Sequence, residues 1–122
     1  MVRLIVSDWQ KATPSEPALQ ELAAVRGIGV RFMVIPEWSG GRIPYARTVH
    51  CKFVVADGTR LWLGSSNGER SYFHASRNTG MAVRSPRMGR LVRAFFLRSW
   101  ESSYAEPVVP GRRSAPREHG GE

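Results

Sequence analysis

Residues 48–66 constrain the fold of this 122-residue chain more than any other segment. Two runs rich in apolar and β-branched residues, 48–56 and 60–66, flank the dipeptide Asp57-Gly58. An Asp-Gly pair between two such runs is a strong signal for a β-hairpin with a tight turn. The sequence therefore predicts two antiparallel strands that are joined by a two-residue turn.

This predicted hairpin would gather polar side chains on one face. Residues two apart on a strand share a face, so His50 and Lys52 project together. A two-residue turn sets His50 opposite Ser65. It also sets Thr48 opposite Asn67, and any even loop length preserves this parity. We therefore expect one cross-strand cluster, made of His50, Lys52, Ser65 and Asn67.

Such a cluster has the side chains needed to attack a phosphodiester. Histidine suits attack on phosphorus at neutral pH, because a good fraction of it is already deprotonated. Lys52 would supply a positive charge and Asn67 an amide donor for the phosphoryl oxygens, with help from Ser65. Asp57 lies beside the turn, so we expect it to fix the turn by hydrogen bonding rather than to handle protons.

The cysteine content argues against disulfide or metal chemistry. Cys51 is the only cysteine, which excludes an internal disulfide and a thiolate-based zinc site. No other set of metal ligands lies near the polar cluster. Because Cys51 alternates with His50 and Lys52, we expect it on the opposite sheet face as an ordinary buried residue.

The N-terminal part of the chain predicts a strand, a helix and a second strand. Residues 2–7 read as the first strand, and Thr13-Pro14-Ser15-Glu16 offers a capping box with proline at the first helical position. Helical spacing of apolar residues continues to Gly27, and residues 30–35 form the second strand. A crossover of this kind predicts that the two strands are parallel.

The C-terminal part predicts one more strand, at residues 80–84, and a final helix capped by Ser85-Pro86. We interpret the apolar face of this helix as core: Met88, Leu91, Val92, Phe95, Phe96 and Trp100. Residues 1–106 are expected to form one domain and residues 107–122 a disordered basic tail. The last dozen residues lack an apolar run and carry Gly, Pro and charge.

The formal net charge of +8, mostly from arginine, favours polyanionic partners such as nucleic acid, anionic lipid headgroups or phosphate esters. GC-rich codon usage would produce the same surplus without a functional demand. No stretch approaches the roughly 18 apolar residues of a membrane span, and the N-terminus lacks the pattern of a signal peptide. A cytoplasmic location is the default expectation.

The pattern H-x-K-x4-D-x6-G-S-x-N resembles the HKD signature of the phospholipase D superfamily at every fixed position. Here it is carried by His50, Lys52, Asp57 and the run Gly64-Ser65-Ser66-Asn67. The likeness covers about residues 2–105. Residues 2–9 and 15–17 look like the second half of two-motif members, and residues 42–47 resemble the branch with lysosomal five-prime exonucleases and bacterial relatives.

This resemblance implies a phospholipase D-like α/β sandwich, with a mixed sheet flanked by helices. It also implies a phosphodiesterase that works in two steps through a phosphohistidine, with His50, Lys52 and Asp57 in the catalytic motif and no metal or other cofactor. In the superfamily, a carboxylate or amide on the next strand holds the second ring nitrogen of the histidine. The matching position here is Asn78, which the register favours over Glu69.

Two departures from the superfamily pattern are relevant to function. Relatives usually carry an aromatic residue after the signature, where this chain has Gly68, and its loss would loosen the pocket rim or alter the substrate. Family sites also use two HKD motifs, one histidine attacking and the other protonating the leaving group. This chain has one motif, so whether His50 is the nucleophile or the general acid stays open.

The missing motif implies a partner. The second motif would come from a second copy in a homodimer or from a separate chain that carries the other half. A third alternative is that the sequence is a truncated gene product. We favour a C-terminal half derived from a two-motif ancestor. The substrate would be a phospholipid or a nucleic acid, and the arginine surplus favours nucleic acid. The alternative hypothesis is a catalytically inactive remnant that binds polyanions.

Overall fold

The computed structural model describes residues 1–41, 43 and 46–116, which form two compact units. Unit 1 comprises Met1–Val49 and Ser99–Glu122, and unit 2 comprises His50–Arg98. The residues expected to form one domain therefore divide between two units. Arg42, Pro44 and Tyr45, from the segment that resembles the exonuclease branch, lie outside the described residues, as do residues 117–122 of the expected tail.

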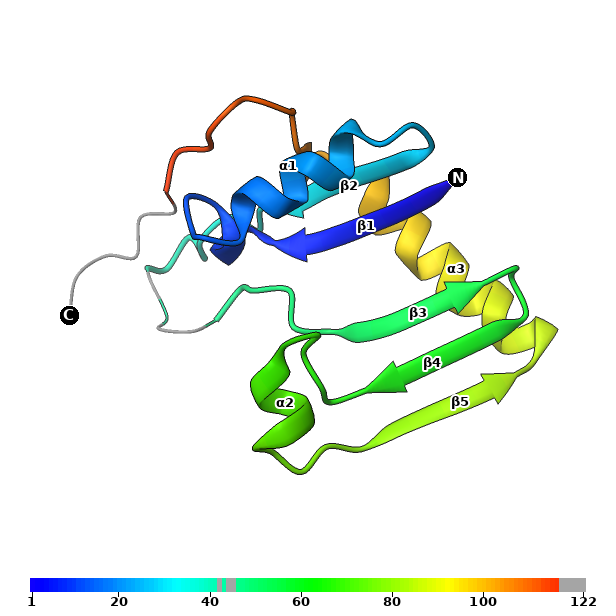
Figure 1. Cartoon of the computed structure of the whole chain (residues 1–122). Helices are drawn as coiled ribbons and strands as arrows, with labels where there is room; N and C mark the ends of the chain where they lie inside the picture. The colour runs from blue at the N-terminus through cyan, green and yellow to red at the C-terminus, as the bar shows by residue number, and fades with distance from the viewer. Residues whose placement is uncertain (42, 44–45, 117–122) are drawn as a thin grey trace. The chain divides into compact units, whose positions relative to one another are not determined.

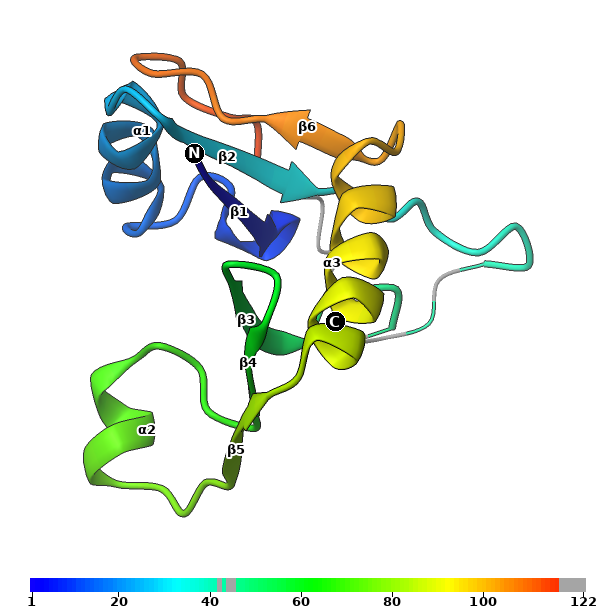
Figure 2. The ribbon, with the colours of Figure 1, turned by 90° about the vertical axis from the view of Figure 1, so that its right-hand side faces the viewer.

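Unit 1 contains a mixed three-stranded sheet in the order β1-β2-β6. Strands β1 (Val2–Ser7) and β2 (Ile28–Met33) pair in parallel, and β6 (Ala105–Pro107) pairs antiparallel with β2 (Figures 1 and 2). The short helix η1 (Asp8–Gln10) and the helix α1 (Glu16–Ala24) connect β1 to β2. The predicted strand–helix–strand unit with parallel strands is confirmed.

The start of α1 differs from the prediction. The helix begins at Glu16 rather than at Pro14, and Ser15 at the N-cap makes no capping bond with its side chain. The carboxylate of Glu16 instead reaches back and accepts a hydrogen bond from the N–H of Ala12 at 2.6 Å. After the helix, Gly27 has a φ of +89°, and this left-handed turn leads directly into β2 at Ile28.

The core of unit 1 follows from the alternation of β1 and β2. Leu4 lies beside Val30 in the parallel register and Val6 lies beside Phe32, so these four side chains share one face of the sheet. Val30 and Phe32 are buried there with Val108. Partly buried residues pack around them: Leu4, Val6, Leu19, Ala23, Ile28 and Val34.

The other face of this sheet holds Trp100. The guanidinium of Arg31 lies 4.5 Å from the centroid of the Trp100 ring, and its Nη1 donates to the Trp100 carbonyl at 2.5 Å. A Cβ at Gly29 would lie 3.0 Å from the same ring, so the absence of a side chain at Gly29 permits this close packing. Trp100 is thus a packing residue, as predicted.

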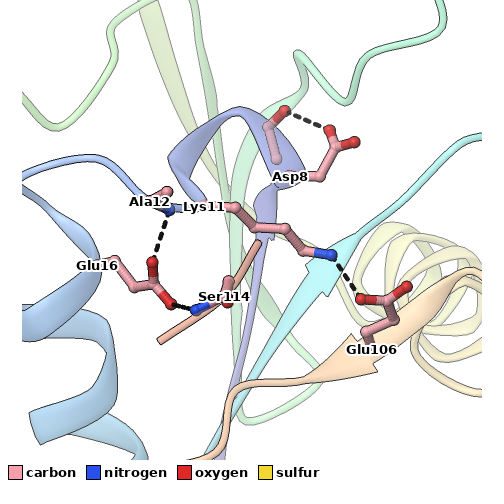
Figure 3. Close-up of polar contacts among 7 residues, drawn as sticks. Asp8, Lys11, Ala12, Glu16, Glu106 and Ser114 are labelled. Carbon is pink, nitrogen blue, oxygen red and sulfur yellow. Dashed lines mark hydrogen bonds and ion pairs between the residues drawn. The ribbon is translucent and has the colours of Figure 1, made fainter. Parts of the chain in front are cut away.

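Residues 107–116 pack on unit 1, so the prediction that a disordered tail starts at residue 107 is wrong for this stretch. Val108 is a core residue, and its N–H donates to the Val30 carbonyl at 2.9 Å. The buried carboxylate of Glu16 accepts the N–H of Ser114 at 2.8 Å (Figure 3). The Gln20 side-chain amide donates to the Arg112 carbonyl at 2.9 Å.

Unit 2 contains an antiparallel sheet in the order β3-β4-β5. Its strands are β3 (Lys52–Ala56), β4 (Arg60–Gly64) and β5 (Gly80–Arg84), and Figure 1 shows the helix α2 (Arg70–His74) between β4 and β5. The helix α3 (Pro86–Trp100) follows β5, and its last two residues belong to unit 1. The predicted α/β class is confirmed, with the strands divided between two small sheets.

The predicted cap of α3 is also confirmed, because the Ser85 hydroxyl accepts the N–H of Met88 at 3.3 Å. The helix packs on the sheet through Phe96, whose ring centroid lies 6.3 Å from that of Phe53. It also approaches the hairpin turn through the buried Gly89, where a Cβ would lie 2.2 Å from the carbonyl oxygen of Gly58. Only glycine permits so close an approach.

The prediction that the whole apolar face of α3 is core is wrong in part. Met88, Leu91 and Phe95 are exposed, Leu91 to the greatest extent. At 100° per residue, these three positions lie roughly 100° or more around the helix from Gly89, the point of closest approach to the hairpin. Because the helix approaches the hairpin through a glycine, only part of the apolar stripe faces the sheet.

Candidate active site

All the residues predicted for the site lie in unit 2. Lys52 is the first residue of β3, and His50 lies two positions before it. The imidazole of His50 is exposed and the Lys52 side chain is half-buried. The Lys52 Nζ donates to the His50 carbonyl oxygen at 2.9 Å, which folds the ammonium group back along the chain toward His50. This bond reaches the backbone of His50, so the expectation that the two side chains project together stays a prediction.

The strand register beyond Lys52 differs from the prediction. Asp57 and Gly58 do form the turn, with φ of +54° and +64°, and the N–H of Thr59 donates to the Ala56 carbonyl at 3.1 Å. Ala56, however, pairs with Arg60, so Thr59 is an extra residue in the loop. The register is shifted by one residue from that of a two-residue turn, which reverses the parity of the predicted pairs.

In the observed register Lys52 lies opposite Gly64, whereas a two-residue turn would have set it opposite Leu63. Gly64 in turn pairs with Gly80 on β5, so these three residues form the last row of the sheet. The ladder ends before His50 and Ser65, and the predicted pairing of these two residues is wrong. His50, Ser65 and Asn67 instead lie beyond this end of the sheet, and Lys52 lies in its last row.

Two glycines and a tryptophan that the sequence reasoning missed form the surface next to Lys52. A Cβ at Gly64 would lie 2.5 Å from the Trp62 ring, and one at Gly80 would lie 3.0 Å from Trp62 Nε1. The indole therefore lies over both glycines. Alternation along the strand already indicates that Trp62 and Gly64 share a face of the sheet. Gly80 joins them only through the register between β4 and β5, which the sequence does not indicate.

Ser65 is held by the segment that leads into β5. Its N–H donates to the Thr79 carbonyl at 2.9 Å, and its hydroxyl accepts the Thr79 N–H at 3.0 Å. The hydroxyl also donates toward Asn78 Oδ1 at 3.4 Å. These contacts fix the direction in which the chain leaves β4 toward Asn67.

Asn78 connects Ser65 to the end of α2. Its Nδ2 donates to the Tyr72 carbonyl at 2.6 Å, which orients Oδ1 toward Ser65. Glu69 is exposed at the N-cap of α2, where its carbonyl accepts the Tyr72 N–H at 3.1 Å. The structure thus brings Asn78 to the signature, while its predicted contact with the imidazole of His50 stays a prediction.

Two side chains of the signature make no hydrogen bond within the described residues: the His50 imidazole and the half-buried Asn67 amide. The backbone carbonyl of each does accept a bond, from Lys52 and from the Ser66 hydroxyl. With respect to residues 1–41, 43 and 46–116, both side chains keep their donors and acceptors for a ligand. Cys51, between His50 and Lys52, is exposed, so the prediction that it is buried is wrong.

Within the same part of the chain, no three His, Cys, Asp or Glu side chains come together in a way that could hold a metal ion. The helices of residues 1–41, 43 and 46–116 also include none with the length and apolar character of a membrane span.

Comparison with known proteins agrees with the signature. The family model described as "Cardiolipin synthase, PLD-like domain" matches residues 1–100. "Phospholipase D Y" of Dictyostelium discoideum is 32% identical over 109 residues, which cover 88% of this chain and 25% of that protein. The "5'-3' exonuclease PLD3" of Rattus norvegicus is 38% identical over 115 residues, covering 85% and 23% respectively.

A third relative, the "5'-3' exonuclease PLD4" of Mus musculus, is 31% identical over 120 residues, covering 85% of this chain and 24% of that protein. The chain thus spans about a quarter of the length of the curated relatives it matches. Because the family model covers residues 1–100, and these residues include the complete signature, the chain belongs to the phospholipase D-like family.

Proposed function

We propose that this chain supplies one HKD half of a phospholipase D-type phosphodiesterase, and that a nucleic acid strand is its substrate. The observation that carries the proposal is the bond from Lys52 Nζ to the His50 backbone carbonyl, which holds the ammonium group next to a residue whose side chain is exposed. Both lie at the end of the sheet where Gly64 and Gly80 present no side chains of their own. The Trp62 indole lies over both glycines, so it would border a phosphoryl group bound at this end.

The reaction would proceed in two displacements. In the first, a ring nitrogen of one HKD histidine forms a bond to phosphorus while the bond to the leaving oxygen breaks. The histidine of the other motif donates a proton to that oxygen. In the second step, water loses a proton to this second histidine and attacks phosphorus, which releases the first histidine. His50 takes one of these two roles.

The other signature residues would bind the phosphoryl group. Lys52 supplies a positive charge and Asn67 an amide donor, and both act on oxygens whose charge is spread in the transition state. Ser65, fixed by its two hydrogen bonds with Thr79, sets the position of the loop that carries Asn67. Asp57, in the left-handed turn at the far end of β3, has a structural role.

The second motif would come from a second copy of this chain or from another chain that carries an HKD half. The chain contains a single motif, and the two-histidine reaction needs two. Nucleic acid is favoured over phospholipid for two reasons. Two of the relatives are named as exonucleases, and the net charge of +8 attracts a polyanion.

The direct test measures turnover of single-stranded DNA, phosphatidylcholine and bis(p-nitrophenyl) phosphate by the chain, with and without its candidate second half. We expect His50→Ala and Lys52→Ala each to lower turnover by about 100-fold or more. His74→Ala is the matched control, because His74 is exposed on α2 and outside the signature. Equal turnover of the wild type and both variants would exclude the assignment.

Light scattering on the same samples tests the alternative hypothesis of an inactive remnant. Our proposal requires that activity appears only when two motifs are present in one particle. A chain that binds DNA with a steep salt dependence, yet stays inactive in every pairing, would support the remnant instead.

A further inference from the structure

Helix α3 carries an exposed apolar stripe that its packing on the sheet covers only in part. The stripe consists of Met88, Leu91 and Phe95, which are 39%, 63% and 46% exposed as whole residues. These residues are spaced three and four apart, so they form one line along the helix. Phe95 still touches Phe53, with ring centroids 6.0 Å apart, and this contact fixes the stripe next to β3.

The same helix is strongly basic. Four exposed arginines lie on α3: Arg87, Arg90, Arg93 and Arg98. The helix contains no acidic residue. At 100° per residue, Arg87 and Arg98 fall next to Leu91 on the solvent side of the stripe. An apolar line with a guanidinium border is the pattern of a helix that lies on an anionic lipid surface.

We propose that this face of α3 docks on the surface of a bilayer that contains anionic phospholipids. A lipid surface satisfies both parts of the pattern, since acyl chains take up the apolar side chains and headgroup phosphates pair with the arginines. A nucleic acid would pair with the arginines but would leave Leu91, the most exposed side chain of the stripe, in water. This docking involves none of the signature residues, so it does not rest on the proposed function.

The number of apolar and charged side chains on this face of α3 sets how strongly it would bind a bilayer. Three partly exposed apolar side chains are too few for a permanent anchor, so binding should be reversible and should weaken with salt. Loss of Leu91 should lower the vesicle partition coefficient by about ten-fold, because a fully buried leucine is favoured by about that factor. Loss of one arginine should lower it by about five-fold.

Cosedimentation of the whole chain with vesicles tests the proposal. The vesicles contain phosphatidylcholine, with or without phosphatidylserine, and the variants are Leu91→Gln and Arg87→Gln. Val25→Gln and Arg26→Gln are the matched controls, because these two residues are also exposed but lie outside α3. Circular dichroism of each variant checks that its fold is kept.

Binding that needs phosphatidylserine, falls in both α3 variants and is unchanged in both controls would support the docking surface. Two results would overturn it. One is binding that Leu91→Gln leaves unchanged, which indicates a general polyanion effect. The other is a wild-type dimer that Leu91→Gln converts into a monomer while neither form binds vesicles, which shows that the stripe is a protein interface.

Discussion

Unit 1 and unit 2 bury their apolar residues to very different degrees. In unit 1 the hydrophobic residues Val30, Phe32, Met33, Ala105 and Val108 are buried. In unit 2, Leu61 is the one hydrophobic residue among those described that is buried to the same extent. Val54, Phe73 and Met81 of unit 2 are largely exposed. Buried apolar area is the main source of stability, so unit 1 should be the more stable unit.

The polar side chains of unit 1 also have more bonding partners than the signature side chains of unit 2. In unit 1 the Glu16 carboxylate accepts bonds from Ala12 and Ser114, and Lys11 pairs with Glu106 at 2.5 Å (Figure 3). The Gln20 amide also donates to the Glu16 carboxylate. In unit 2, the His50 and Asn67 side chains have no partner within the described residues. The unit that carries the signature is therefore the less stabilised one, and a bound partner or ligand should raise its stability more than that of unit 1.

The largest expected effect comes from the core of unit 1. Phe32→Ala should lower the free energy of unfolding by about 3–5 kcal/mol, because it removes a fully buried ring and leaves a cavity. Val54→Ala in unit 2 is the control, and it should cost less than about 0.5 kcal/mol because Val54 is 59% exposed. Denaturant unfolding measures both. Similar losses would show that the two units do not differ in packing.

The second effect tests the tightest contact of unit 2. Gly89→Ala would place a Cβ 2.2 Å from the Gly58 carbonyl oxygen, so α3 or the hairpin turn must move. We expect a loss of about 1–3 kcal/mol, measured by thermal unfolding. The matched control is Gly68→Ala, where a Cβ meets nothing within 4 Å. If both variants unfold like the wild type, α3 does not pack against the turn as described.

The positions of most strands could be predicted from the sequence, because alternation and turn residues are local signals. Residues 2–7 and 80–84 form strands with the predicted bounds. The hairpin register could not be predicted, since it depends on one loop residue, Thr59, whose carbonyl accepts the N–H of Ser85 at 2.8 Å. Helix α2, with five residues, is too short for a periodic signal.

Long-range partners explain the other failures. Nothing local indicates that Glu16 will bind the N–H of Ser114, so composition alone suggested a disordered tail. In the candidate site, too, some contacts are local in sequence and others are long-range. His50 and Lys52 lie together because they are two apart on one chain, whereas the bonds of Ser65 to Thr79 depend on how β5 returns to β4. Local neighbours are predictable, and partners across the fold require the structure.

A third, smaller effect concerns the buried carboxylate of unit 1. Burial by itself raises the pKa of Glu16, but the hydrogen bonds from Ser114, Ala12 and Gln20 outweigh it and hold the pKa below its ordinary value of 4.5. The charged form is therefore favoured in the folded state. Its contribution to stability is fully present above about pH 4.5 and is lost as the pH falls through the lowered value.

Glu16→Gln should therefore cost about 1–2 kcal/mol at neutral pH, and this difference from the wild type should shrink as the pH falls below 4.5. Denaturant unfolding over a pH series measures it. Glu21→Gln is the control, because Glu21 is an exposed neighbour on the same helix. A pH-independent difference between wild type and Glu16→Gln would contradict the role of the charge.

The smallest effect separates two possible roles of Asp57 in the signature. Asp57 and Ala12 both have positive φ, +54° in unit 2 and +56° in unit 1. Glycine removes the strain of a positive φ but loses more conformational entropy on folding. Aspartate tolerates a positive φ better than alanine does. Asp57→Gly should therefore change stability by less than about 0.5 kcal/mol, and Ala12→Gly should be equal or more favourable.

Turnover of the Asp57→Gly variant then decides the role. A turn residue should leave phosphodiester turnover within a few-fold of the wild type, because the backbone conformation is kept and Lys52 stays opposite Gly64. Loss of turnover as large as that of His50→Ala, with stability unchanged, would show that the carboxylate takes part in the reaction. In that case the chemistry of unit 2 would extend the full length of β3, from Lys52 to the turn.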